Sequence, residues 1–307
     1  MDVFVAGATG TLGRPTVQAL VQAGHAVRGM ARSEAKAAML RDLGAESVPV
    51  DLFEPDAVAK AVAGSDAVLR LATKIPSTAK MRSRKAWLEN DRIRSEGARI
   101  LCEAAMAAGA QLYVQESIAY VYADGGEEWI DEDAPLDAPA ESNIASALAG
   151  EREAARFTAS GGSGIALRLG GFYAPYASTT LDMIRLARRR MAPVVGDGDF
   201  YVCSIHVDDA ARAVVAALAA PAGIYNVCDD EPVRQREFVQ ALADAMGFKR
   251  PRTVPTWLAR VAAGELGKYL TRSQRVSNRR LKDATGWTPG YPSVRVGFES
   301  VAASLKP

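Results

Sequence analysis

The chain has 307 residues, 49% of them hydrophobic, and a formal net charge of +1. This length and apolar content suffice for one large core, or for one core and a small satellite domain. The near-neutral charge offers no basic field for nucleic acid, and we interpret the only basic run, 188–190, as a solvated helix face.

Cysteines, histidines and apolar runs narrow the class of protein further. The three cysteines have no CxxC spacing and the two histidines are far apart, so the sequence predicts no metal site. The first predicted strand begins at the second or third residue, which leaves no room for a signal peptide, and no apolar run approaches the ~18 residues of a membrane span. We therefore expect a cytoplasmic protein with reduced thiols and no membrane partner.

Residues 3–6 predict a short buried strand that runs into a glycine-rich turn and then into an amphipathic helix. This order is typical of a phosphate cradle. Gly7 permits the tight turn, Gly10 lets the backbone approach a pyrophosphate, and Gly13 allows the helix to pack closely on the strand. The residues expected to contact a dinucleotide are Gly7, Thr9, Gly10, Thr11, Leu12 and Gly13.

The next predicted strand, 26–30, bears on the choice of dinucleotide. An NAD site usually has an acidic residue near the end of this strand, which holds the ribose 2′-hydroxyl. The segment has no acid but carries Arg28 and Arg32, whose guanidinium groups suit bidentate contact with a 2′-phosphate. The other interpretation is that both arginines are ordinary solvated charges. We expect NADP(H) to be favoured, with NAD(H) as the alternative.

Predicted strands and helices alternate through the first 170 residues. The strands cover 46–50, 67–71, 112–116 and 164–169, and the helices cover 55–63, a long segment ending near 108, and 142–159. This alternation predicts an α/β fold, a doubly wound parallel sheet of about seven strands with helices on both faces.

The pattern loosens after residue 170, where residues 201–206 predict one strand and the last segment is mainly helical with proline-marked loops. We expect a dinucleotide-binding domain of residues 1–172 and 201–228. The smaller substrate lobe is expected to comprise residues 173–200 and 229–307.

Several motifs are similar to those of one family. They are the glycine turn 7–13, Asp51-Leu52 after the third strand, Leu71-Ala72 at the end of the fourth, Asn90 with Gly97, the segment 114–122, Arg168 with residues 173–175, and the segment 205–209. Together they resemble the extended short-chain dehydrogenase/reductases, the NAD-dependent epimerase/dehydratase family with a Rossmann domain, over nearly the whole chain.

The resemblance implies roles for these positions. Asp51 and Leu52 are expected at the adenine, and Leu71 and Ala72 beside the cofactor. The Asn90 and Gly97 signature is expected to be mainly structural. An aspartate of the segment 205–209 is expected to cap a helix.

The chain departs from the family where a catalytic tyrosine and lysine stand one helical turn apart. The tyrosine of that pair exchanges a proton with the substrate oxygen, and the lysine lowers its pKa and holds the ribose. Asn143 and Ala147 occupy the matching positions, a register supported by the spacing from Ser117 and by the acidic-proline segment 131–135. An asparagine amide cannot act as a general acid near neutral pH, and alanine has no ionisable group. The usual proton relay is therefore absent.

Four side chains near the carboxyl edge of the predicted sheet are candidates to replace this pair, with Asn143 as a fifth candidate. Ser117 can hydrogen-bond a carbonyl, and Tyr120 or Tyr122 can act as an acid if its pKa is lowered. Lys74 can place an ammonium near the substrate. For each tyrosine a packed structural role is the alternative, and for Lys74 an exposed loop position.

Each of four further side chains has two alternative roles. Glu116, at the end of a buried strand, is either paired structurally or a candidate base. Tyr173 and Tyr176 could reach the nicotinamide or serve as apolar cover. His206 is a candidate base, but the resemblance favours a structural or pocket-lining role.

These observations favour an atypical short-chain dehydrogenase/reductase that binds NADP(H) and a small organic substrate. Hydride transfer to or from a carbonyl, imine or activated alkene is the expected chemistry. The alternatives are a non-redox isomerase, dehydratase or cyclase on the same fold, and a nicotinamide-dinucleotide sensor or scaffold without turnover. A homodimer is left open.

Overall fold

The computed structural model describes residues 1–77, 80–81, 83–140, 142, 144–263 and 266–305. Its centre is a seven-stranded sheet in which every neighbouring pair is parallel, in the order β12-β7-β5-β4-β1-β2-β3. The strands are β1 (Asp2–Ala6), β2 (Ala26–Met30), β3 (Glu46–Val48), β4 (Ala67–Arg70), β5 (Leu112–Ile118), β7 (Ser163–Leu169) and β12 (Gly223–Val227). The prediction of a doubly wound parallel sheet is confirmed.

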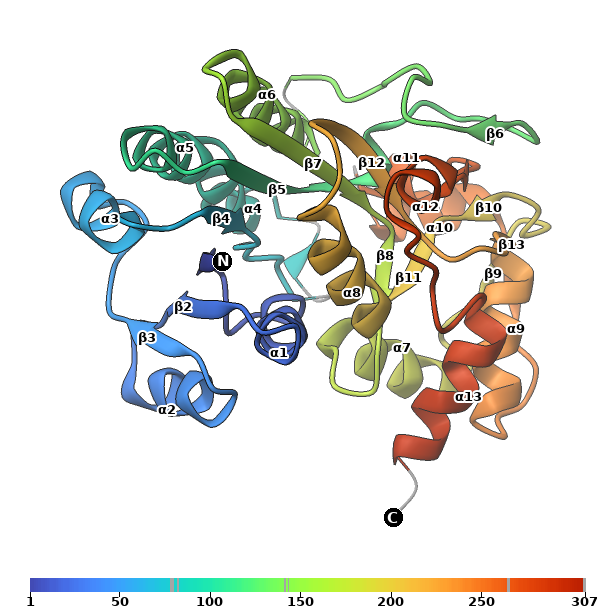
Figure 1. Cartoon of the computed structure of the whole chain (residues 1–307). Helices are drawn as coiled ribbons and strands as arrows, with labels where there is room; N and C mark the ends of the chain where they lie inside the picture. The colour runs from blue at the N-terminus through green and yellow to red at the C-terminus, as the bar shows by residue number, and fades with distance from the viewer. Residues whose placement is uncertain (78–79, 82, 141, 143, 264–265, 306–307) are drawn as a thin grey trace.

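Helices cover both faces of this sheet (Figure 1). They can do so because a strand such as β1 is apolar on both sides, with Val3, Phe4 and Val5 fully buried. One face packs against α1 (Gly13–Gln22), α2 (Glu34–Asp42) and α8 (Val207–Ala217). The other packs against α3 (Pro55–Val62), α5 (Ala98–Ala107) and α6 (Ala145–Ala159). The long helix predicted to end near residue 108 consists of α4 (Arg84–Arg92), a π-helical turn (Ile93–Gly97) and α5.

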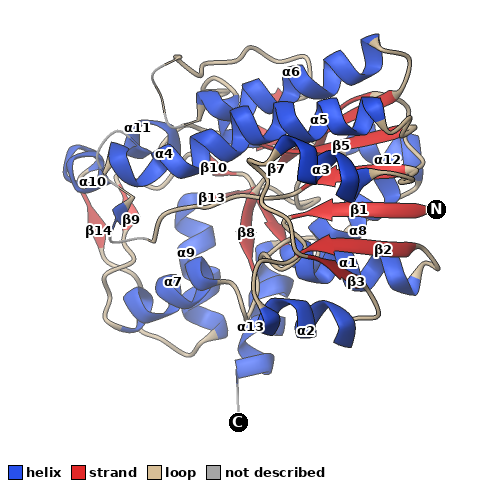
Figure 2. Ribbon diagram, turned by 90° about the vertical axis from the view of Figure 1, so that its left-hand side faces the viewer, coloured by secondary structure: helices blue, strands red, loops and turns tan. Residues whose placement is uncertain are grey.

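Most of the remaining elements gather beyond the carboxyl ends of the strands, toward which the arrowheads of β1 and β2 point in Figure 2. The helices there are α7 (Ser178–Arg188), α9 (Gln235–Ala245), α10 (Thr256–Ala263), α11 (Leu266–Leu270) and α13 (Val294–Leu305), whereas α12 (Arg279–Thr285) packs against β12 and α8. The short strands pair as β8 (Gly171–Tyr173) with β11 (Ser204–His206), β9 (Val194–Val195) with β14 (Thr253–Val254), β10 (Tyr201–Val202) with β13 (Val233–Arg234), and β6 (Trp129–Ile130) with β15 (Arg275–Val276).

The single strand predicted at 201–206 is therefore two strands, β10 and β11, with different partners. In the large sheet β1 lies between β4 and β2, so the strand order reverses direction beside it. Doubly wound sheets bind ligands at the carboxyl edge of such a switch point. No helix in the described part of the chain is long and apolar enough to cross a membrane.

Candidate functional site

The glycine-rich turn joins β1 to α1 and packs on the end of β4. Gly7 has a φ of +90°, and a Cβ there would lie 2.5 Å from the amide nitrogen of Ala72. A Cβ at Gly13 would lie 2.0 Å from the carbonyl oxygen of Gly7, and the Gly10 amide donates a hydrogen bond to that oxygen at 2.9 Å. Within the described residues no side chain caps the amino end of α1, and its first turn contains no acid. The cradle thus fits the diphosphate of a dinucleotide, which needs close backbone and free amides.

The predicted contact residues divide by exposure. Gly10 and Thr11 are exposed and Thr9 is half-buried, so these three residues form the open side of the turn. Leu12 and Leu71 are buried in the core beneath it.

Arg32 and Asp51 follow the carboxyl ends of β2 and β3, where the adenosine of a dinucleotide would lie. Nη1 of Arg32 is 3.5 Å from Oδ2 of Asp51, and the two side chains are 62% and 44% exposed. A pair this exposed contributes little to stability, so the guanidinium of Arg32 is available to a 2′-phosphate.

Arg28 requires a correction. Its guanidinium donates hydrogen bonds to the carbonyl oxygens of Ala61 and Ala63, at 2.8 and 2.9 Å, and to Oγ of Ser65 at 2.7 Å. Ala61 lies in the last turn of α3, and Ala63 and Ser65 lie between α3 and β4, at the amino edge of the sheet. Arg28 therefore ties α3 to the amino edge of the sheet and does not belong to a cofactor site at the carboxyl edge.

The Asn90 and Gly97 signature has a structural explanation. Oδ1 of Asn90 accepts a hydrogen bond from the amide of Lys74 at 3.0 Å, and a Cβ at Gly97 would lie 2.6 Å from Cδ2 of Leu52. The signature thus positions the segments that follow β3 and β4. Nζ of Lys74 lies 2.6 Å from Oε2 of Glu89 in an exposed ion pair, which leaves this lysine a loop residue rather than a buried ammonium.

Ser117 is fully buried at the end of β5. Its hydroxyl donates to Oε1 of Glu151 at 2.5 Å, and the same carboxylate accepts from Nε and Nη2 of Arg168 at 2.9 and 2.8 Å. A bidentate pair of this kind holds both charges in a fixed geometry. Ser117 is thus part of a buried network, and Glu151 lies one helical turn after Ala147.

Tyr122 belongs to the same network. The guanidinium of Arg168 lies 4.8 Å from the centroid of its ring, and its hydroxyl donates to Oδ1 of Asn226 at 2.7 Å. Burial raises the pKa of this hydroxyl. The structure therefore favours the packed role for Tyr122.

Tyr120 differs from the other two hydroxyl candidates. It lies in the short helix Ala119–Val121 that follows β5, half-buried, and a Cβ at Gly171 would lie 2.8 Å from its hydroxyl oxygen. No hydrogen-bond partner for this hydroxyl is found among the residues that the structure describes. Burial raises the pKa of Tyr120, which makes the hydroxyl a weaker acid.

Of the two positions that replace the catalytic pair, the structure describes only Ala147. Asn143 lies outside the described residues. Ala147 is fully buried in the first turn of α6 and brings no polar atom beyond its backbone.

Of the two roles considered for Glu116, a structural partner or a base, the contacts favour the structural one. Its Oε1 lies 2.5 Å from Nη2 of Arg94, and its Oε2 lies 3.4 Å from Nη2 of Arg70. Two buried guanidinium groups thus offset the charge of this buried carboxylate.

His206 is also structural. Its Nδ1 accepts a hydrogen bond from the Asp208 amide at 3.2 Å and so caps α8, while its ring lies tilted against that of Tyr291 with centroids 4.0 Å apart. The expectation that an aspartate caps this helix is wrong. Asp209 instead accepts from the amides of Gly290 and Tyr291, each at 2.8 Å, and so anchors the loop before α13.

A buried carboxyl that the sequence analysis did not single out is Asp229, which follows β12. Its oxygens accept hydrogen bonds from the hydroxyl of Ser204 at 2.9 Å and from that of Tyr173 at 3.2 and 3.3 Å. Burial raises the pKa of Asp229 from its ordinary 3.8 to about 8. The signal available in the sequence was an acid two residues after the end of a strand.

The pKa of Asp229 predicts a pH-dependent stability. Between pH 7 and 8 the folded protein retains a proton at Asp229 that the unfolded chain has released, so the free energy of unfolding falls as pH rises, by up to about 1.4 kcal/mol per pH unit. His206, whose pKa burial lowers, carries no charge in this window. Urea titrations across the window should show the slope in the parent and a flatter profile in Asp229→Asn. An unchanged slope in the variant would contradict the assignment.

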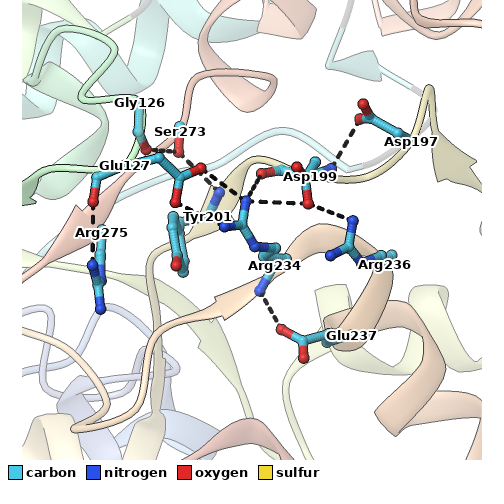
Figure 3. Close-up of polar contacts among 10 residues, drawn as sticks. All are labelled: Gly126, Glu127, Asp197, Asp199, Tyr201, Arg234, Arg236, Glu237, Ser273 and Arg275. Carbon is cyan, nitrogen blue, oxygen red and sulfur yellow. Dashed lines mark hydrogen bonds and ion pairs between the residues drawn. The ribbon is translucent and has the colours of Figure 1, made fainter.

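The acidic loop before α6 is fixed to the C-terminal elements by a cluster around Arg234 (Figure 3). Its guanidinium donates to both carboxylate oxygens of Glu127, at 3.0 and 2.7 Å, and lies 3.1 Å from the carboxylate of Asp199. Tyr201 lies between Arg234 and Arg275, at 4.6 and 5.2 Å from its ring centroid. These contacts connect the loop at Glu127 to β10, β13 and β15.

Comparison with known proteins agrees with this geometry. The model of the NAD dependent epimerase/dehydratase family matches residues 3–228. The chain is 35% identical to a 3-diazoavenalumate denitrifying reductase of a Streptomyces species, over 97% of this chain and 99% of the relative. It is 30% identical to the ceramide reductase of Caulobacter vibrioides, over 97% and 89%.

Among solved structures, the human epimerase family protein SDR39U1 with NADPH superposes with a TM-score of 0.80 at 21% identity, over 99% of this chain and all of that one. The likeness establishes the fold. The match to the family model and the relatives that align over 97% of this chain show the family to which it belongs. The chain belongs to the NAD-dependent epimerase/dehydratase family, as an atypical short-chain dehydrogenase/reductase.

Proposed function

We propose that this protein is an NADP(H)-dependent reductase whose substrate accepts hydride without a simultaneous proton. The observation that carries the proposal is the combination of a complete glycine cradle with Asn143 and Ala147 in place of the tyrosine and lysine. A chain that keeps the cofactor cradle but lacks the proton relay is suited to an acceptor for which that relay is unnecessary.

The cofactor is proposed on two features. Gly7, Gly10 and Gly13 leave space for a diphosphate, and the exposed Arg32 suits the 2′-phosphate that distinguishes NADPH from NADH. When bound, NADPH would supply a hydride from its nicotinamide ring.

The class of hydride acceptor is proposed from the side chains that were candidates to donate a proton. Ser117 and Tyr122 are engaged in the buried network, and Lys74 is paired at the surface. Burial raises rather than lowers the pKa of Tyr120. Burial also raises the pKa of Tyr122, so both tyrosines are weaker acids than an efficient proton donor at neutral pH.

A cationic acceptor removes the need for a proton, because hydride addition to it gives a neutral product. Iminium and arenediazonium ions are of this class. For an arenediazonium ion the balance is hydride to carbon, loss of the nitrogen molecule, and oxidation of NADPH to NADP⁺. The name of the 35% identical relative gives a diazo compound as its substrate and denitrifying reduction as its reaction, which supports this choice.

A second candidate is carbonyl reduction with Tyr120 as the acid. It is favoured by the hydroxyl of Tyr120, which has no partner among the described residues and follows the strand end that carries Ser117. Its raised pKa disfavours the role, and for that reason we place it second.

The test is the transfer of label from NADPH deuterated at the transferable position of its nicotinamide ring. The acceptors are an arenediazonium ion, an iminium ion and a ketone, each assayed separately. We expect deuterium in the products of the two cations, detected by mass spectrometry. Deuterium in none of the three products, with NADPH bound, would favour the sensor or the non-redox enzyme.

Tyr120→Phe separates the two candidates. Because it removes only the hydroxyl, the single-turnover rate with a cationic acceptor should not change. If the ketone is the true substrate type, its rate should instead fall on the order of 10²–10⁴-fold, the usual contribution of a general acid. The matched control is Tyr122→Phe, which removes a hydroxyl bonded to Asn226 and should act on stability.

A further inference from the structure

Arg14 is the second residue of α1 and directly follows the glycine cradle. Its amide donates to the carbonyl oxygen of Gly10 at 3.1 Å, which fixes its backbone one step beyond the open side of the turn. Its side chain is exposed, and no acidic partner for it is found in the described part of the chain. The guanidinium carbon lies 5.3 Å from the centroid of the ring of Tyr176.

Tyr176, the aromatic partner of Arg14, belongs to a segment that is distant in sequence. It lies in the loop between β8 and α7, directly after residues 173–175 of the motifs that resemble the family. Its hydroxyl donates to Oδ1 of Asp208 at 2.6 Å, and Asp208 is in the first turn of α8, the helix that His206 caps. The ring of Tyr176 is thus anchored to α8 while its face meets Arg14.

The relative strengths of two interactions decide what Arg14 can do. An exposed cation–π contact is weak, whereas a charge-assisted hydrogen bond from guanidinium to phosphate is stronger. A guanidinium resting on an aromatic face also keeps its N–H edge free to donate. Arg14 can therefore bind an anion beside the cradle without leaving Tyr176.

We propose that Arg14, backed by Tyr176, forms an arm that binds the diphosphate of the dinucleotide and connects it, through Asp208, to the start of α8. This inference rests on the proposed cofactor. It differs from the role of Arg32, because the diphosphate is common to NADPH and NADH while the 2′-phosphate is not.

The experiment measures the dissociation constants of NADPH, NADH and adenosine 2′-monophosphate, which has no diphosphate, for matched arginine variants. Arg14→Gln should weaken NADPH and NADH by the same factor, roughly 10-fold to 100-fold, and leave adenosine 2′-monophosphate unchanged. Arg32→Gln should weaken NADPH and adenosine 2′-monophosphate and leave NADH unchanged. Thermal unfolding of Arg14→Gln should match the parent, because the side chain is exposed.

Tyr176→Ala tests the backing of the arm. It should weaken both dinucleotides by a smaller factor, and the double variant with Arg14→Gln should bind no more weakly than Arg14→Gln alone, because the two residues act as one unit. Unchanged binding of both dinucleotides by Arg14→Gln, or additive losses in the double variant, would overturn the arm alone. A parent protein that binds neither dinucleotide would overturn the proposed cofactor together with it.

Discussion

Arg168→Met should lower the free energy of unfolding by about 3–5 kcal/mol, because it leaves the carboxylate of Glu151 buried without its partner. Arg168 and Glu151 have side chains only 3% and 8% exposed, and the pair also holds the hydroxyl of Ser117. Urea denaturation of the parent and the variant measures the difference.

Two further variants keep this prediction falsifiable. Glu151→Leu combined with Arg168→Met should recover much of the loss, since an apolar pair replaces an ion pair at little cost. Arg99→Met removes a partner from the exposed pair with Glu103 and should cost less than about 1 kcal/mol. If Arg168→Met costs no more than Arg99→Met, the buried network does not stabilise the site as described.

The second large effect concerns cofactor selectivity. Arg32→Gln should weaken NADPH by about 1–3 kcal/mol, the value of charge-assisted hydrogen bonds to a phosphate, and leave NADH nearly unchanged. Calorimetric titration with both cofactors measures this difference.

Arg28→Gln is the matched control for Arg32→Gln. Because the guanidinium of Arg28 is bonded to Ala61, Ala63 and Ser65, its loss should reduce stability and leave the ratio of NADPH to NADH affinity unchanged. A shift of that ratio in Arg28→Gln but not in Arg32→Gln would reverse the two assignments.

The large sheet was predictable because its signals are local. Apolar runs such as Val3, Phe4 and Val5 alternate with amphipathic helices, and the glycine turn before α1 specifies its own geometry. The division of 201–206 into β10 and β11 was not predictable, since it depends on two partner strands, β13 and β8, from distant parts of the chain.

The difference between local signals and long-range contacts also explains which side-chain roles the sequence could predict. Arg28 is predicted correctly on a strand, and Ser117 is predicted just after the strand that in fact contains it. The groups to which their side chains are hydrogen-bonded, the carbonyl of Ala61 and the carboxylate of Glu151, are more than 30 residues away in sequence. Asp229 was missed for the same reason, because its burial depends on packing that a strand pattern does not specify.

The central claim is that hydride transfer proceeds here without a side-chain proton donor. Its most direct test is the ratio of kcat/KM for an iminium ion to that for the ketone of the same carbon skeleton, measured with saturating NADPH. We predict turnover of the iminium ion, little or none of the ketone, and no change of the iminium rate in Tyr120→Phe. Comparable turnover of the ketone, lost in Tyr120→Phe, would contradict the claim and make Tyr120 the catalytic acid.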